Sequence, residues 1–351
     1  MKVVHTGQHV EMAHALYRFF DMPPDIVVDL QRKSAGLSHL TAVLMERVED
    51  AMVRTDPDVV LVQGDTTSAL VGALVGYYHR LPVAHIEAGL RTYEREPFPE
   101  EKNRELIGRL AHWHFAPTEQ ARLNLLSEGI SAKCIYEVGN PVIDAALWTR
   151  ERIADPAFDL ARLMPRPLSL FLSRNPDAPL VLVTAHRREN WGEPIRDIAT
   201  ATARILEENP NAVAVWPVHP NPAVVSDVDE GLAGTDPAVR GRLLLTGALE
   251  YPVMIHLLTR ARLALTDSGG IQEEASALGV PVLIARESTE RQELVDGGGA
   301  ALVGTEVDVM VSAANALLAS RAAHAAMCVN ESPFGDGHSA NRIAQILSER
   351  P

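Results

Sequence analysis

Short apolar runs rich in β-branched residues alternate with longer segments of helical periodicity along most of the chain. This alternation is typical of parallel strands joined by crossover helices. The strand-like runs of the first half cover 2–6, 59–63, 82–86 and 112–116, and helical patterns follow near 9–20, near 67–80, from about 100 and from 117. The pattern predicts an α/β fold with parallel sheets.

The alternation breaks between about 140 and 178, where prolines interrupt helical patches and no strand-like run occurs. It restarts with apolar runs at 180–185, 212–218, 242–247, 262–267 and 280–285. We therefore predict two α/β halves with a hinge near 140–178 and a cleft between them. Ligands of open α/β sheets bind at the carboxyl ends of strands, so the loops after these runs are the candidate site.

A length of 351 residues exceeds what one hydrophobic core ordinarily supports, which agrees with two domains. Apolar residues make up 46% and aromatic residues 5%, and no apolar stretch is long enough to span a bilayer. The N-terminus soon turns polar and fits neither a signal peptide nor an anchor. A cytoplasmic protein without membrane contact is expected.

The charge balance argues against nucleic acid as the main partner, because 46 acidic residues outnumber 32 basic ones and the formal charge is −14. A phosphate ligand would then be bound by helix N-termini and a few arginines. Cys134 and Cys328 are far apart and lack metal-ligand spacing, so we interpret them as buried free thiols.

The segment TDSGGIQEEA (266–275) follows an apolar run and begins a helix. Ser268 can cap this helix, and Gly269 and Gly270 let a ligand approach the backbone, so the helix start is a candidate anion site. Glu274, about one turn further, is well placed to accept hydrogen bonds from the two hydroxyls of a ribose. Taken alone, the same letters are better explained by a capped helix with a tight turn.

Acidic residues follow successive strand ends in the first half. Asp65 comes after the second strand-like run, where it could also be a simple N-cap. Glu87 lies just past the third run, among small residues and without an obvious structural purpose. Glu100 and Glu101 begin a proline-primed helix, where acids are favoured anyway. These sites predict a group of carboxylates suited to general acid and base catalysis.

Histidines and arginines occupy the strand ends of the second half. His186 and Arg187 come directly after one apolar run, His219 lies in a proline-fixed loop, and Arg286 and Arg291 follow another run. A lone histidine is usually structural, but a histidine followed by arginines at a strand end is a reasonable contact for an anion.

Several cofactor signatures are absent from the sequence. No G-x-G-x-x-G follows a strand and no Walker A sequence occurs. HWH (112–114) is interpreted as packing rather than a metal site, because no carboxylate cluster is near it. The chemistry is therefore expected to proceed without a bound dinucleotide, P-loop hydrolysis or a metal.

Ten motifs in order resemble those of the non-hydrolysing UDP-N-acetylglucosamine 2-epimerases over essentially the whole chain. They are QGDTTSA, HIEAGLRT, PEEKNR, HFAPTE, GNPVIDA, TAHRREN, PVHPNP, TDSGGIQEEA, ESTERQE and SPFGDGHSANRI. The resemblance implies two Rossmann-like domains facing a cleft, the arrangement of GT-B glycosyltransferases. The expected bounds are a first domain at 1–150, a connector at 151–178, a UDP-binding domain at 179–330, and a helix within 331–351 that packs back on the first domain.

The reaction implied by the resemblance is a reversible inversion at C2 that interconverts UDP-GlcNAc and UDP-ManNAc. Because the C2 proton is next to no carbonyl, the anomeric C–O bond breaks first, and 2-acetamidoglucal with UDP is the expected intermediate. The resemblance implies no cofactor and implies a homodimer. By motif, the catalytic residues are the acid/base carboxylates Asp65, Glu87 and Glu100, together with His186, a diphosphate contact that aids the departure of UDP. The residues that match UDP-sugar contacts are Ser268, Gly269 and Gly270 in the diphosphate loop, Glu274 at the ribose, and Arg104, His219 and Arg291 at further site positions.

Three features depart from the family pattern. The family's first strand and its Gly-Thr-Arg-Pro-Glu loop have no counterpart, so we expect that the chain begins late and lacks a central strand of its first sheet. Gln8 and His9 match a second site for activating UDP-GlcNAc, but Ala35 stands where that site has a glutamine, so activation is not expected. Gln292 stands where the family has proline, a minor loop change.

Three other activities share parts of this pattern. A GT-B glycosyltransferase would need an acceptor site, and the carboxylates after the strands of the first half point away from it. A hydrolysing epimerase would release ManNAc and UDP. A catalytically impaired UDP-sugar binding protein is the third alternative, because of the missing N-terminal loop.

Overall fold

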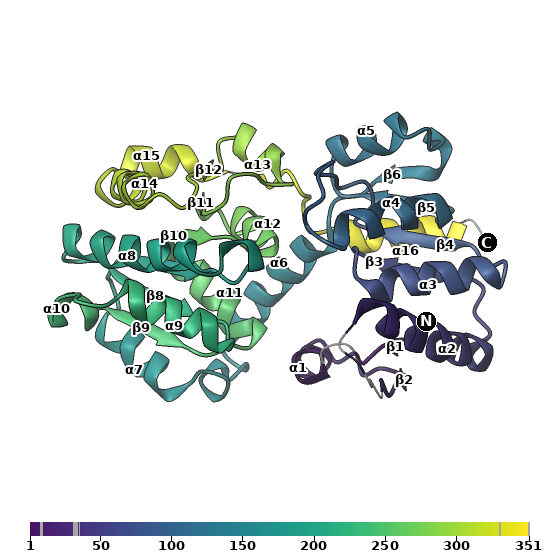
Figure 1. The fold of residues 1–351 in the computed structure, drawn as a ribbon, viewed down its shortest axis with the longest axis horizontal. Helices are drawn as coiled ribbons and strands as arrows, with labels where there is room; N and C mark the ends of the chain where they lie inside the picture. Colours follow the sequence, from purple (N-terminus) through teal and green to yellow (C-terminus); the bar gives the residue numbers. More distant parts are fainter. Residues whose placement is uncertain (8–9, 31–33, 35, 330, 350–351) are drawn as a thin grey trace. The chain divides into compact units, whose positions relative to one another are not determined.

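The computed structural model describes the chain except residues 8–9, 31–33, 35, 330 and 350–351. The chain forms two compact units (Figure 1). Unit 1 comprises Met1–Pro141 and Gly337–Pro351, and unit 2 comprises Val142–Asp336. Both units contain parallel sheets covered by helices, which confirms the predicted α/β class.

Unit 1 contains a four-stranded parallel sheet in the order β3-β4-β5-β6 and a separate parallel pair, β1-β2. Its strands are β1 (Val4–His5), β2 (Ile26–Val27), β3 (Val60–Gln63), β4 (Val83–Ile86), β5 (Trp113–Ala116) and β6 (Ile135–Glu137). Its helices are α1 (Val10–Phe19), α2 (Leu37–Thr55), α3 (Thr67–Tyr78), α4 (Glu100–Leu110), α5 (Glu119–Ser127) and α16 (Ser339–Glu349).

Helix α16, at the far end of the chain, packs against the four-stranded sheet of unit 1 (Figure 1). Ile343 is buried in one apolar cluster with Phe115 of β5 and Ala84 of β4. Arg342 also donates from Nη1 to the carbonyl oxygen of Val138, at 3.2 Å. The last helix therefore completes the core of the first unit.

Unit 2 contains a six-stranded parallel sheet in the order β12-β11-β10-β7-β8-β9. Its strands are β7 (Leu180–Thr184), β8 (Val213–Pro217), β9 (Leu243–Thr246), β10 (Ala261–Thr266), β11 (Val282–Ile284) and β12 (Ala300–Leu302). Its helices are α6 (Pro141–Ala154), α7 (Arg166–Arg174), α8 (Glu193–Glu208), α9 (Pro222–Gly231), α10 (Pro237–Arg240), α11 (Tyr251–Arg260), α12 (Gly269–Ala277), α13 (Gln292–Asp296), α14 (Val307–Ala319) and α15 (Arg321–Met327).

Strands β7 and β10 lie side by side at the centre of this sheet, and the strand order runs outward from them in opposite directions. Side chains of β7 alternate between two apolar clusters, with Val181 and Val183 on one face and Leu180 and Leu182 on the other. Burial on both faces explains the continuous apolar runs. The carboxyl ends of β7 and β10 form the topological switch point, where open α/β sheets bind ligands.

The predicted connector, 151–178, belongs to unit 2 instead of linking two domains. Helix α7 buries Leu168 and Leu172 in the cluster beneath the six-stranded sheet. The prolines in this segment separate short helices, and the apolar sides of these helices still pack on the sheet. The first unit consequently ends near Pro141 rather than at 150.

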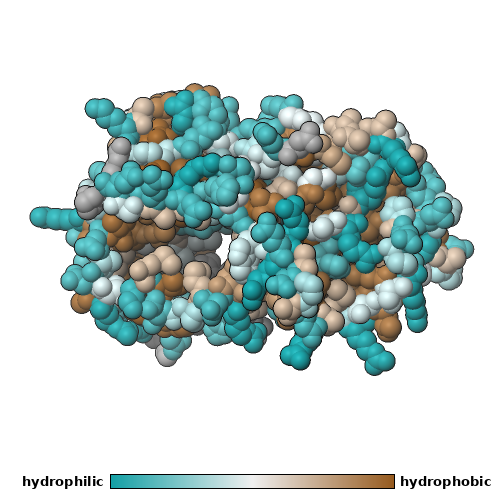
Figure 2. Space-filling view, turned by 180° about the vertical axis from the view of Figure 1, so that it is seen from behind, coloured by the Kyte–Doolittle hydropathy of each residue, from teal (hydrophilic) through white to brown (hydrophobic). Residues whose placement is uncertain are grey.

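The face drawn in Figure 2 carries many hydrophilic residues with smaller hydrophobic patches among them. Among the described residues, no helix has the length and apolar character that crossing a membrane requires. Cys134 and Cys328 are free thiols, as predicted, but both are half-buried rather than buried.

Candidate functional site

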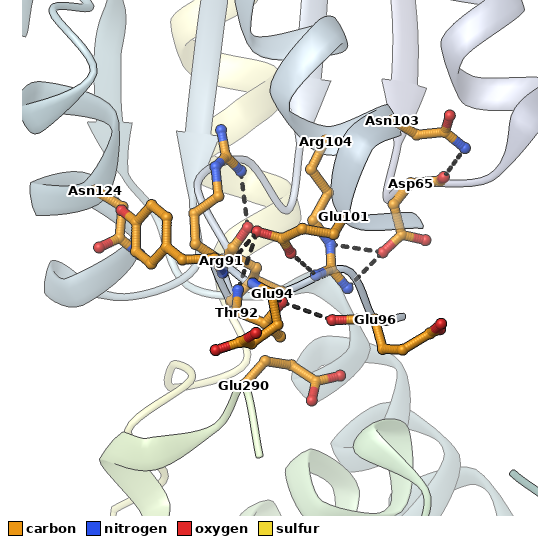
Figure 3. A network of polar contacts seen from close by, with 12 residues as sticks. Asp65, Arg91, Thr92, Glu94, Glu96, Glu101, Asn103, Arg104, Asn124 and Glu290 are labelled. Carbon is orange, nitrogen blue, oxygen red and sulfur yellow. Dashed lines mark hydrogen bonds and ion pairs between the residues drawn. The ribbon is translucent and has the colours of Figure 1, made fainter. Parts of the chain in front are cut away.

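The turn after β3 presents Asp65 in unit 1. Thr66, not Asp65, is the N-cap of α3, because its hydroxyl accepts a hydrogen bond from the backbone N–H of Ala69. The Asp65 side chain instead meets Arg104 of α4, with Oδ2 at 2.8 Å from Nε and 2.7 Å from Nη2 (Figure 3). Asn103 donates from Nδ2 to the Asp65 carbonyl at 2.7 Å. The simple N-cap interpretation of Asp65 is therefore wrong.

Arg104 is shared between Asp65 and a second carboxylate, Glu101 (Figure 3). Glu101 is 2% exposed, accepts from Arg104 Nη1 at 2.9 Å, and accepts from the backbone N–H groups of Thr92 and Tyr93 at 3.1 Å. Glu101 thus fixes both the arginine and the loop after β4. The family motif pointed to the neighbouring Glu100, but the three-residue spacing from Glu101 to Arg104 on a helix also indicates an ion pair.

Glu87 directly follows β4 and has a left-handed backbone, with φ of +65°. This conformation is uncommon for residues other than glycine and costs on the order of 1–3 kcal/mol. Its Oε2 lies 3.5 Å from the position that a Cβ on Gly64 would occupy, so the side chain extends toward the turn that carries Asp65. Glu100 is the first residue of α4 and is half-buried. These carboxyl groups come from adjacent strand ends and one helix start.

In unit 2, the switch point is organised by Asp267, which follows β10 and is fully buried. Its Oδ2 accepts from the backbone N–H groups of His186 and Arg187, both at 2.9 Å, and from Asn190 Nδ2 at 3.1 Å. Asp267 therefore fixes the loop after β7. This role of Asp267 was not predicted from the sequence, although its position as a charged residue directly after an apolar strand indicates a function at the strand end.

His186 extends from this loop and is partly exposed. Desolvation lowers its pKa, while the nearby Asp267 carboxylate, 3.5 Å from Nδ1, acts in the opposite direction. The ring stacks on His219, with centroids 6.4 Å apart and planes at 17°. The lowered pKa favours a neutral imidazole that acts through hydrogen bonds rather than charge.

The loop after β10 ends at Ser268, the N-cap residue of α12, whose side chain makes no cap hydrogen bond. The N–H groups of a first helical turn have no acceptor within the helix and attract anions. Gly270 is open, since a Cβ there would meet no atom within 4 Å. Gly269 is covered, since a Cβ there would lie 2.6 Å from Cζ of Arg291.

Arg291 is 6% exposed and belongs to a buried ionic cluster. Its Nε lies 2.8 Å from Glu273 Oε1 and its Nη1 lies 2.5 Å from Glu290 Oε1. Glu290 also pairs with Arg286 at 2.9 Å, and these arginines hold its pKa down to about 2 against the effect of burial. The cluster holds the Arg291 guanidinium against the start of α12.

Glu274 lies further along α12 and is 8% exposed. Burial raises its pKa to about 8, although a hydrogen bond with the Tyr251 hydroxyl lowers it in part. Near neutral pH the carboxyl group is therefore mostly protonated when no ligand is bound. Hydroxyl groups that donate to it would stabilise the carboxylate and lower this pKa.

The structure groups the predicted residues within each unit. In unit 1, Asp65 and Arg104 are in contact, and Glu87 lies beside their turn. In unit 2, His186 and His219 stack, and Arg291 covers the start of α12. Gln8 and His9, the predicted second-ligand residues, lie outside the described residues. The described part of the chain contains no group of three or more His, Cys, Asp or Glu residues that could hold a metal ion.

Comparisons with known proteins cover almost the whole chain. The sequence model of the family described as UDP-N-acetylglucosamine 2-epimerase matches residues 1–348. A UDP-N-acetylglucosamine 2-epimerase of Yersinia pestis is 42% identical over 99% of this chain and 90% of its own length. The chain also resembles the crystal structure of UDP-GlcNAc 2-epimerase from Neisseria meningitidis bound to UDP-GlcNAc, with a TM-score of 0.91, 34% identity, and coverage of 99% of this chain and 92% of that one.

A second similar structure is the UDP-GlcNAc 2-epimerase of Methanocaldococcus jannaschii in complex with UDP-GlcNAc and UDP. It has a TM-score of 0.82 and 31% identity, and the match covers 99% of this chain and 91% of that chain. The matches extend over both units, and their sequence identities are higher than a shared fold alone requires. The chain belongs to the UDP-N-acetylglucosamine 2-epimerase family.

Proposed function

We propose that this protein catalyses the reversible C2 epimerisation of UDP-GlcNAc to UDP-ManNAc without net hydrolysis. The observation that carries the proposal is the set of carboxyl groups at the β3 and β4 ends of unit 1, in a chain that matches this family along its length. Such carboxyl groups can accept and return a proton. The helix start at the switch point of unit 2 fits the binding of a diphosphate.

The reaction has to overcome the low acidity of the C2 proton. When the anomeric C–O bond breaks, its electron pair leaves with UDP and positive charge develops at C1. A carboxylate then takes the C2 proton, and the C2–H electron pair forms the C1=C2 double bond of 2-acetamidoglucal. UDP re-adds to C1 while a proton returns to C2 on the other face, so all atoms are conserved.

The two units have different tasks in this proposal. Unit 1 supplies the acid and base, for which Asp65, Glu87 and Glu100 are the candidates. Arg104 orients the Asp65 side chain through their ion pair. Unit 2 binds the leaving group. Its proposed diphosphate contacts are Ser268, Gly269, Gly270 and His186. His219 and Arg291 are further proposed contacts of the UDP-sugar, and Glu274 binds the ribose.

Incubation of the purified protein with UDP-GlcNAc in deuterated water tests this proposal. We expect UDP-ManNAc to form with deuterium at C2, as measured by nuclear magnetic resonance and mass spectrometry, without an added acceptor. Free ManNAc with stoichiometric UDP would instead establish the hydrolysing alternative. Binding of UDP-GlcNAc without deuterium incorporation would establish a UDP-sugar binding protein and contradict the proposed catalysis.

Glu274→Gln is expected to weaken UDP binding and to stabilise the ligand-free protein. The raised pKa of about 8 means that the unfolded chain releases this proton at lower pH than the folded protein does. The free energy of unfolding therefore falls as the pH rises from about 4.5 to about 8, by at most about 5 kcal/mol. Glutamine removes this dependence, so the variant should gain stability relative to the unmodified protein between pH 5 and pH 8.

Denaturant unfolding at both pH values, without ligand, measures this difference, and calorimetry measures the accompanying loss of UDP affinity. The exposed Glu207, on α8 of the same unit, provides the control Glu207→Gln, which should leave both quantities unchanged. A Glu274→Gln protein with the same pH dependence as the unmodified protein would contradict the assignment of a protonated buried carboxyl group.

A further inference from the structure

We propose that His85 is a positioning residue for Asp65, acting through a hydrogen bond to the carbonyl group of Gly64. The inference rests on the proposed function, because it concerns the placement of a candidate acid/base carboxylate. Gly64 and Asp65 form the turn between β3 and α3, and His85 lies on the neighbouring strand β4. His85 itself has no role among the candidate catalytic or binding residues.

The turn is held through its backbone by groups from two directions. His85 Nε2 lies 2.8 Å from the Gly64 carbonyl oxygen, and Asn103 Nδ2 lies 2.7 Å from the Asp65 carbonyl oxygen. The Gly64 N–H donates to the carbonyl of Ile86 at 3.1 Å. Gly64 has φ of +70°, a conformation open to glycine that lets the chain reverse here. Of these three bonds, that of His85 fixes the carbonyl group immediately before Asp65.

The hydrogen bond to Gly64 also determines the tautomer of the His85 ring. A carbonyl oxygen only accepts hydrogen bonds, so Nε2 carries the hydrogen and the neutral ring has its lone pair on Nδ1. His85 is 1% exposed, and desolvation lowers its pKa to about 3, so the ring stays neutral at physiological pH. Nδ1 is enclosed without a hydrogen-bond partner among the described residues. The imidazole is thus a fixed donor rather than a proton carrier.

A buried imidazole with one unsatisfied nitrogen is a costly way to fill space on an interior strand. The other three side chains of β4 are apolar and buried. An apolar residue would fill the same volume without the desolvation cost. The desolvation cost of the imidazole is therefore best explained by a need for a hydrogen-bond donor at this point, beside the turn that carries a candidate catalytic residue.

His114 on β5 provides a matched comparison, because it is the register partner of His85. It is also 1% exposed, and desolvation lowers its pKa to about 4. Its backbone hydrogen bond goes to Ala111, which precedes β5 at the amino end of the strand. His114 therefore has the burial and chemistry of His85 but is directed away from the carboxyl-end turn.

The experiment compares His85→Leu and His85→Gln with His114→Leu and His114→Gln in the full-length protein. A glutamine Nε2 can replace the imidazole Nε2 as donor, whereas leucine cannot. We expect His85→Leu to lower the kcat of deuterium incorporation at C2 by about 10- to 100-fold, the size expected when a catalytic group is misplaced. In His85→Leu, the KM for UDP-GlcNAc should change less than kcat. His85→Gln should keep most of the activity. His114→Leu should leave kcat unaltered, at a melting temperature comparable to that of His85→Leu.

Amide hydrogen exchange of the peptide covering 61–70 supplies a readout that needs no catalysis. His85→Leu should lose protection there, and both His85→Gln and His114→Leu should keep it. Equal protection in His85→Leu and His114→Leu, or equal kcat loss in both, would overturn the positioning role. If the unmodified protein incorporates no deuterium at all, the proposed function fails, while the protection of 61–70 still decides the role of His85.

Discussion

Asp65→Asn is expected to lower the rate of C2 proton exchange by about 10²- to 10⁴-fold, the usual contribution of a general acid or base. Asparagine has nearly the same shape and its oxygen can still accept from Arg104, which lies 2.7 Å from the carboxylate. The amide cannot take up or deliver the proton. The loss should therefore fall on kcat, measured as deuterium incorporation at C2 from UDP-GlcNAc.

The exposed Glu119, which is paired with Arg122 in the same unit, gives the control Glu119→Gln. This control also removes a carboxylate from an arginine pair but should leave kcat unchanged. UDP affinity should be retained in Asp65→Asn, because the proposed UDP contacts belong to unit 2. Deuterium incorporation at the rate of the unmodified protein would exclude Asp65 from acid or base catalysis.

Gly269→Ala is expected to abolish UDP binding and to destabilise the protein strongly. The new Cβ would lie 2.6 Å from both Cζ and Nη1 of Arg291, so either the start of α12 or the guanidinium has to move. Movement of the buried arginine would break its ion pairs with Glu273, at 2.8 Å, and with Glu290, at 2.5 Å, although Glu290 would keep its pair with Arg286. Breaking a buried ion pair in this way costs about 3–5 kcal/mol.

The next residue gives a control of the same chemistry, Gly270→Ala, where a Cβ meets no atom within 4 Å. Alanine is about 1 kcal/mol more favourable than glycine within a helix, so this variant should be slightly more stable. Denaturant unfolding measures the stability of both variants, and calorimetry measures UDP binding by Gly269→Ala. Stability changes of the same sign for the two alanines would show that Arg291 does not determine the effect at Gly269.

The apolar pattern predicted the longer central strands because these are buried on both faces and read as continuous runs. The short strands β2, β6 and β12, of two or three residues, have too few positions to show any period. Helix α2 was missed for another reason, because its N-cap, Gly36, offers no capping side chain. Its apolar residues Leu40, Leu44, Val48 and Met52 repeat every four positions and could have revealed it.

Because ligands of open α/β sheets bind at the carboxyl ends of strands, the sequence alone predicted Asp65, Glu87, His186 and Ser268 as candidate site residues. What the sequence did not reveal was which neighbours hold them. Glu101 and Asp267 act on loops that are 8 to 9 and 80 to 81 residues away from them. Such pairings depend on which loops the topology brings together, and a local pattern carries no information on that.

The placement of α16 in unit 1 affects the order in which the chain can fold during synthesis. The ribosome delivers all of unit 2, Val142–Asp336, before the helix that covers Phe115 and Ala84. Domains generally fold as units while the chain emerges, so unit 2 can reach its final state first. The apolar surface of unit 1 around Phe115 and Ala84 therefore stays uncovered until α16 has left the exit tunnel, which is after all of unit 2 has been synthesised.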